Sequence, residues 1–229
     1  MRHTLHLVIL AASLPAAHAA RPVFSHPRSI TNPYLPLGSL KQDILESHPG
    51  ERVLRTVLPG TRTFILNGKS FAAMTVEDRE SMKGRTTEVT KDYFAQDDAG
   101  NVYYLGEEVD QYRNGKVVAH EGAWMLGKDT KTPGVLVPAH PKVGARWRSE
   151  DVPHGPVEYD MVVSTTAVVT AGGKTYRNCL KVKETTADGV EMKYYAPGVG
   201  VVQEGDGNDA VRLVRHTVKG RRSGAGPHR

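Results

Sequence analysis

Turn-forming dipeptides divide this chain into short segments and restrict it to hairpin architectures. They stand at Asn67-Gly68, Asn114-Gly115, Gly172-Gly173 and Asp188-Gly189. Asparagine, aspartate and glycine readily adopt the positive φ angles that a two-residue hairpin turn requires. Several β-hairpins in series are therefore expected.

The segments between these turns have the composition of β-strands. They are rich in β-branched and aromatic residues, and turn residues separate them at short intervals, a pattern that predicts an antiparallel meander. We expect an all-β fold in which the meander forms a curved sheet or a partly closed barrel, with little helix. The expected strands are Arg52–Leu58, Thr63–Asn67, Ser70–Glu77, Thr86–Gln96, Val102–Tyr112, Val117–Leu126, Glu158–Thr170, Thr175–Thr185, Val190–Ala196, Gly200–Glu204 and Ala210–Val218.

One predicted strand, Thr87–Gln96, has no cleanly apolar face. Side chains alternate between the two faces of a strand, so Val89 and Tyr93 lie on one face, and Asp92 and Phe94 on the other. Such a strand is typical of a sheet that lines a ligand-facing concavity. It is also typical of a sheet with both faces partly in water, and the sequence leaves both interpretations open.

Residues 1–19 have the pattern of a signal peptide. Arg2 precedes an apolar run, Leu7–Leu14, and Ala17-His18-Ala19 is a small-x-small cleavage motif. We expect cleavage between Ala19 and Ala20, and a secreted or periplasmic location. The apolar run is much shorter than the ~20 residues of a membrane-spanning helix, so no membrane span is expected.

Cys179 is the single cysteine of the chain. An intramolecular disulfide is therefore excluded, and core packing alone must hold the fold in an oxidising compartment. A bacterial lipid anchor needs a cysteine as the first residue of the mature chain; Ala20 or Arg21 stands there, so a lipid anchor is not expected either. Cys179 lies in a strand-like run, which predicts a buried small hydrophobe and not a reactive thiol.

Composition divides the mature chain into three parts. Residues 20–50 carry several prolines, which fix φ and remove a backbone donor, so we expect an extended segment with at most a short helical turn at Lys41–Ser47. Residues 51–218 form the single β-rich domain. The apolar residues that we expect to dock from the first part onto a sheet edge are Ile30, Tyr34, Leu35 and Leu37.

Residues 219–229 form a basic tail that contributes to the net charge of +5. The tail is rich in glycine and lacks apolar periodicity, so it is predicted to be disordered. One interpretation is a solvated chain end. The alternative is contact with an anionic surface; no specific nucleic acid is expected as a partner.

Several blocks of the sequence together resemble a family of uncharacterised bacterial secreted proteins, over roughly Ile30–Glu204. These blocks are Asn32–Leu37, Tyr93–Asp97, Gly100–Glu107, Tyr112–Gly115, Gly122–Trp124, Pro133–Val135, Pro138–Gly144 and Tyr194–Gly200. The last block is also similar to the closing hairpin of periplasmic proteins with lipoprotein-carrier-like or lipocalin-like sheets. The resemblance implies export and a curved β-fold, and it carries no activity.

Acidic and aromatic residues gather on neighbouring predicted strands. If these hairpins pair, the residues meet on the sheet, where acids beside flat rings suit a cationic or sugar-like ligand. The alternative is a solvated strand face paired with nearby lysines and arginines. The candidate binding residues are Asp92, Tyr93, Tyr104, Glu107, Glu121 and Trp124.

No catalytic, cofactor or metal motif occurs in the sequence, including His-Glu-x-x-His, Gly-x-Ser-x-Gly and the calcium loop. No catalytic residue, metal ligand or cofactor is therefore assigned. We expect an exported, non-enzymatic protein that binds a small apolar or amphiphilic molecule. The alternatives are a surface-interaction or structural module with a filled core, and a glycan hydrolase that uses two of the carboxylates.

Overall fold

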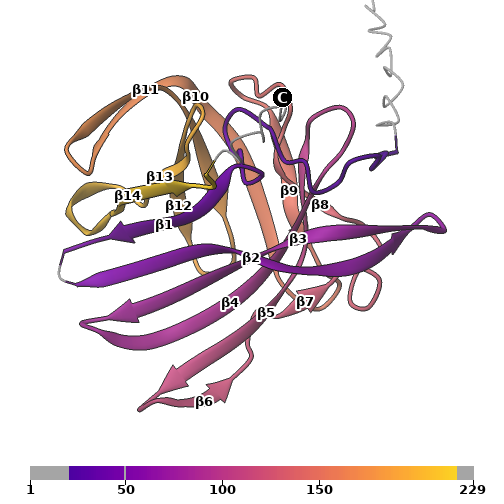
Figure 1. Ribbon diagram of the computed structural model, residues 1–229, viewed down its shortest axis with the longest axis horizontal. Coiled ribbons are helices and arrows are strands. Elements are labelled where there is room, and N and C mark those ends of the chain that lie inside the picture. Colours follow the sequence, from indigo (N-terminus) through magenta and orange to yellow (C-terminus); the bar gives the residue numbers. More distant parts are fainter. Residues whose placement is uncertain (1–20, 49, 221–229) are drawn as a thin grey trace, which may run out of the picture.

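A computed structural model describes residues 21–48 and 50–220 of the chain (Figure 1). The described residues form one strongly curved antiparallel sheet. The predicted signal peptide and cleavage site, and residues 221–229 of the predicted tail, lie outside the described residues.

The first strands are β1 (Leu40–Glu46), β2 (Glu51–Leu66), β3 (Lys69–Met82), β4 (Arg85–Gln96), β5 (Val102–Arg113), β6 (Lys116–Ala119) and β7 (Trp124–Met125). The remaining strands are β8 (Gly134–Val137), β9 (Arg146–Asp151), β10 (Val157–Ala171), β11 (Lys174–Thr185), β12 (Val190–Ala196), β13 (Gly200–Glu204) and β14 (Val211–Val218).

The sheet consists of two meanders joined along their first and last strands. Its order is β6-β5-β4-β3-β2-β1-β14-β13-β12-β11-β10-β9, and β7 and β8 pair with β5. The join is the antiparallel pair β1 and β14, in which Asp43 lies opposite His216 and Leu45 opposite Leu213. The prediction of an all-β antiparallel meander with a curved sheet is confirmed. Within the described residues, the only helical segment is a single 3₁₀ turn at Gly207–Asp209.

The sheet curls until β9 lies beside β7 and β8, but β9 forms no strand ladder with them (Figure 1). Side chains connect the two edges: Trp124 Nε1 donates a hydrogen bond to Glu150 Oε1 at 3.3 Å. The hydroxyl of Thr130 donates another to the carbonyl of Asp151 at 3.1 Å. The curl thus gives the sheet a largely enclosed concave side, although the two ends of the strand order do not pair with each other.

Local turn chemistry produces the hairpins. Asn67 and Gly68 have φ angles of 53° and 77°, which match a two-residue turn with positive φ at both positions. The predicted turns at Asn114-Gly115 and Gly172-Gly173 have the same signature, whereas the loop that contains Asp188-Gly189 spans residues 186–189. Lys83-Gly84 makes a further such turn, between β3 and β4.

Four details of the predicted secondary structure are wrong. Lys41–Ser47 is not helical, because Leu40–Glu46 pairs with β2 on one side and β14 on the other. The predicted strands on either side of Pro59 are one strand, β2, with an irregularity between Val57 and Thr61 that accommodates the proline. Val117–Leu126 breaks into β6 and β7, and the short strands β8 and β9 were not predicted at all.

The proline-rich segment completes the core instead of lying on the surface. Ile30, Leu35 and Leu37 are buried in the main hydrophobic cluster, as expected of docking apolar residues. Asn32 holds the segment in place, because its Nδ2 donates to the carbonyls of Gly100 and Pro138 at 2.9 and 3.2 Å. Such a buried amide stabilises the fold only because its hydrogen bonds are made.

A second, smaller cluster covers the other face of the sheet. It is built around Phe64, Phe71 and Tyr93, and Phe24 stacks on Phe71 with ring centroids 4.3 Å apart.

Cys179 is fully buried in the main cluster, so the prediction of a buried hydrophobe is confirmed. None of the helices in the described part of the chain has the length and apolar character needed to cross a membrane.

Candidate functional site

The concave side of the sheet contains a cavity of about 250 Å³. One part of its wall is apolar and includes Leu35, Leu37, Phe94, Leu136 and Val201. The rest is polar and strongly acidic. The acidic lining residues are Asp78, Glu80, Glu88, Asp92, Glu107, Glu150, Glu158 and Glu204, and the basic ones are Arg55 and Lys193.

Strand alternation explains why these acids share one face. Glu88, Thr90 and Asp92 stand at every second position of β4, and Asp78 and Glu80 do so on β3. Because the strands pair in antiparallel register, acids of neighbouring strands lie against one another; Asp92, for example, lies opposite Glu107 of β5. The curl of the sheet brings the acids of β9, β10 and β13 to the same cavity.

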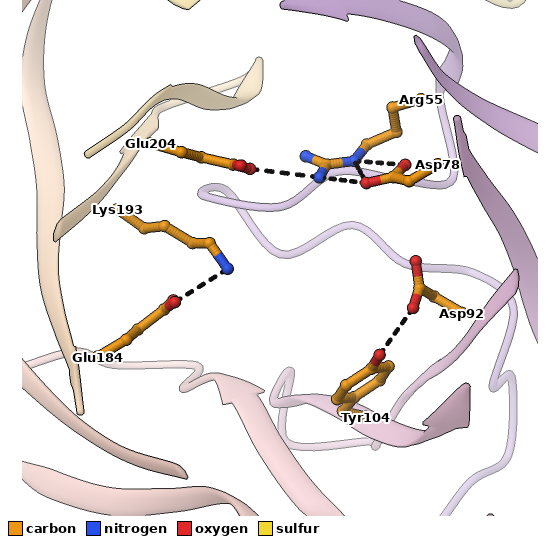
Figure 2. A network of polar contacts seen from close by, with 7 residues as sticks. All are labelled: Arg55, Asp78, Asp92, Tyr104, Glu184, Lys193 and Glu204. Carbon is orange, nitrogen blue, oxygen red and sulfur yellow. Dashed lines mark hydrogen bonds and ion pairs between the residues drawn. The ribbon is translucent and has the colours of Figure 1, made fainter. Parts of the chain in front are cut away.

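Arg55 links the two meanders across the cavity (Figure 2). Its guanidinium lies 2.6 Å from Asp78 Oδ2 and 3.3 Å from Glu204 Oε1. Burial works against the charge of Arg55, but the two carboxylates raise its pKa well above the usual value. Burial alone would raise the pKa of Glu204; the charges of Arg55 and Lys193 outweigh it and lower that pKa.

Lys193 is the second buried cation of the cavity. Its Nζ lies 2.9 Å from Glu184 Oε2 (Figure 2). Burial opposes its charge, yet Glu184 and Glu204 raise its pKa well above the usual value. Both basic residues of the lining are thus already engaged with carboxylates of the protein.

Aromatic rings stand beside Asp92 and Glu107 in the wall of the cavity, and Tyr104 is the ring that contacts Asp92. The hydroxyl of Tyr104 donates to Asp92 Oδ1 at 2.7 Å (Figure 2). The ring of Tyr104 stacks on Phe94 at 5.2 Å between centroids and meets Trp124 edge-on at 5.3 Å. These rings form a rigid wall next to the carboxyl groups.

Burial raises the pKa of four acids that line the cavity. Burial first, and then a neighbouring carboxylate, raises the pKa of Asp92 to about 7 and that of Glu107 to about 8. For the same reasons the pKa of Glu80 and that of Glu150 rise to about 7. The charge of the cavity therefore changes near neutral pH, as is common at functional sites.

The structure places the six candidate binding residues in different environments. Asp92, Tyr104 and Glu107 line the cavity. Trp124 lies behind Tyr104 and is buried. Tyr93 belongs to the cluster on the opposite face, and Glu121 is exposed in a turn. Three of the six thus reach the cavity directly.

Several residues of the site were not singled out from the sequence. Arg55 and Glu204 lie far apart along the chain, and only the curvature of the sheet brings them together. One sequence signal for such residues is a charged residue on a strand face that also carries apolar residues. Lys193 is an example, because it stands two positions before the buried Tyr195 and so shares its face. Buried charges require partners, so such positions indicate an internal polar site.

One group of oxygen atoms in the described part of the chain could hold a metal ion. Glu158, Asp160 and Glu184 each offer one carboxylate oxygen, and these oxygens lie within 4.8 Å of one another. The group adjoins the cavity, because Glu158 lines it and Glu184 contacts Lys193. The acids come from two strands, so no local spacing in the sequence reveals them.

Comparisons of this chain with family models, curated proteins and solved structures find no match. The resemblance to a family of bacterial secreted proteins stays a prediction. The chemistry of the cavity therefore carries the functional argument.

Proposed function

We propose that the protein binds a small organic cation with an apolar body inside its curved sheet. One observation carries this proposal: eight carboxylate residues line the cavity, against two basic residues that are already paired. Carboxylates that lack a protein cation attract a positively charged ligand, and the attraction is stronger in a buried site than in water.

The rest of the wall favours an amphiphilic ligand. Phe94 and Tyr104 present stacked rings, and Leu35 and Leu37 add aliphatic surface. An ammonium group gains from both the carboxylates and the ring faces, while an alkyl chain gains from the apolar wall. A cavity of about 250 Å³ limits the ligand to a small molecule.

The two alternative functions have less support. A structural module with a filled core does not need a polar cavity. A glycan hydrolase needs one protonated and one ionised carboxyl at the same pH. The excess of acidic over basic residues in the cavity wall suits a cationic ligand, whereas hydrolysis needs two carboxyls only. Asp92, one of the paired acids, already accepts a hydrogen bond from the hydroxyl of Tyr104. Binding is therefore the better-supported function.

Isothermal titration calorimetry with three ligands of one chain length tests the proposal. Hexylammonium, hexanol and hexanoate share the same alkyl body and differ in charge. At pH 8.5 we expect hexylammonium to bind at least about tenfold more tightly than hexanol, which corresponds to about 1.4 kcal/mol, and hexanoate not to bind. Equal binding of all three would contradict recognition of a cation.

A matched pair of variants locates the binding site. Asp92→Asn combined with Glu107→Gln removes two acidic groups from the cavity while it preserves their shape, so hexylammonium binding should weaken. Glu121→Gln alters an exposed acid of a turn and should leave binding unchanged. If both proteins bind as the unmodified chain does, the ligand does not use this cavity.

We also propose that the chain is exported, as the pattern of residues 1–19 indicates. Amino-terminal sequencing of the protein recovered outside the cytoplasm should begin at Ala20. A retained leader would contradict this.

A further inference from the structure

Three acids meet at the junction of β10 and β11, next to the cavity. Glu158 and Asp160 stand two positions apart on β10 and so share a face, and Glu184 of β11 lies directly opposite Asp160. Asp160 and Glu184 are only 2% and 3% exposed. Like charges directly opposite one another destabilise a sheet, so this arrangement needs a compensating positive charge or bound protons.

Among the residues that the structure describes, none donates a hydrogen bond to one buried oxygen of Asp160. This oxygen, Oδ1, is fully buried. Trp147 lies opposite Asp160 on β9, but its indole nitrogen is also without a hydrogen bond, so it does not satisfy this oxygen. Buried carboxylate oxygens nearly always have a hydrogen-bond donor or a metal ion as a partner. When Asp160 is ionised, this oxygen therefore needs a ligand.

The charges of the group leave room for one divalent ion. The three carboxylates together carry three negative charges when ionised, and Lys193, 2.9 Å from Glu184, supplies one positive charge. The remaining two negative charges match a divalent cation. The hydroxyl of Ser149, which donates to Glu158 Oε1 at 2.6 Å, orients one of the carboxylates.

We propose that Glu158, Asp160 and Glu184 bind one hard divalent cation of the calcium class. Carboxylate oxygens are the ligands that such ions prefer, at about 2.3–2.6 Å from Ca²⁺. Two oxygens on opposite sides of one Ca²⁺ are therefore about 4.6–5.2 Å apart, and the three oxygens of this group fall within 4.8 Å. The ion reaches the site through the cavity, which Glu158 lines.

Terbium luminescence tests the proposal. Tb³⁺ replaces Ca²⁺ in oxygen sites and emits when a nearby indole is excited, and Trp147 lies opposite Asp160. The full chain is treated with a chelator, desalted and titrated with Tb³⁺ at pH 8, after which Ca²⁺ is added as competitor. We expect saturable emission that Ca²⁺ displaces. Absence of emission, together with no heat from Ca²⁺ in a calorimeter, overturns the proposal.

Isosteric variants assign the ligands. Asp160→Asn should weaken Ca²⁺ binding at least about tenfold, because it replaces a charged ligand by a neutral one. Asp188→Asn, in the exposed turn between β11 and β12, should not change it. Circular dichroism establishes that each variant is folded. Unchanged Ca²⁺ affinity in a folded Asp160→Asn variant overturns the assignment.

Lys193→Met gives a second and opposite readout. Removal of the ammonium next to Glu184 raises the negative charge of the group, so Ca²⁺ binding should become tighter, while binding to a site elsewhere would not change.

The Asp92→Asn/Glu107→Gln variant separates this proposal from the proposed function. It should bind hexylammonium more weakly and Ca²⁺ with unchanged affinity; weaker binding of both would overturn a separate metal site.

Discussion

Arg55 shows how single residues hold the acidic interior together. Its guanidinium contacts Asp78 of the adjacent strand and Glu204 of the other meander, and all three side chains are mostly buried. A buried ion pair contributes little relative to an apolar replacement of the whole group. Loss of one partner is costly, however, because the charges left behind stay out of water without compensation.

We therefore expect Arg55→Gln to destabilise the protein by about 3 kcal/mol at pH 8. The variant leaves Asp78 and Glu204 without their main cation. Urea denaturation followed by tryptophan fluorescence measures the change in the free energy of unfolding.

The matched control is Arg52→Gln on the same strand. Arg52 lies 3.7 Å from Glu46, and both side chains are about half exposed. Exposed pairs of this kind contribute about 0–1 kcal/mol, so this variant should unfold almost as the unmodified chain does. Equal effects of the two substitutions would contradict the structural role of Arg55.

At the scale of elements, the contact between β8 and β9 encloses the cavity. Gly134 of β8 lies against the backbone of Ser149 on β9, and a Cβ atom on Gly134 would overlap the carbonyl oxygen of Ser149. Ser149 is fully buried. A side chain at position 134 therefore has to push β9 away from β8.

Gly134→Ala should destabilise the protein by about 3 kcal/mol, a typical cost of overpacking. The matched control is Gly60→Ala in β2, where a Cβ atom meets nothing within 4 Å and φ is not positive. This control should stay within about 0.5 kcal/mol of the unmodified chain. Thermal denaturation of both variants measures the difference in their stability. Similar melting temperatures would show that the fold does not depend on the close approach of β8 and β9.

The elements that the sequence predicts well are those with local causes. Asn67-Gly68 and Asn114-Gly115 determine their hairpins through their own backbone preferences, so the strands around them could be predicted. Strand β1 could not, because Leu40–Glu46 is rich in residues that also suit a helix, and only pairing with β2 and β14 makes it a strand.

The same distinction holds for the candidate site. Asp92, Tyr104 and Glu107 lie on one hairpin, so local pairing places them together, and the sequence indicates them. Glu204 and Lys193 reach the cavity from the other meander. Their position depends on how far the whole sheet curls, and no local pattern of residues encodes that curvature.

At the scale of the whole molecule, the buried carboxyl groups bind protons more tightly than carboxyl groups in water do. Burial raises the pKa of Glu107 and of Asp160 to about 8, and the pKa of Asp92, Glu150 and Glu184 to about 7. Carboxyl groups in an unfolded chain have pKa values near 4. Between about pH 4 and pH 8 the folded protein therefore holds protons that the unfolded chain has released.

Stability should consequently fall as the pH rises from about 5 to about 8.5, because unfolding then releases protons and higher pH favours it. Thermal denaturation across this range, with metal removed, should show a melting temperature several degrees lower at pH 8.5; about 1 kcal/mol corresponds to roughly 2–4 °C in a chain of this size. The Asp92→Asn/Glu107→Gln variant, which has two fewer titrating groups, should show a smaller drop. A melting temperature that rises over this range, or an equally steep drop in the variant, would mean that these carboxyls are not the groups that hold the protons.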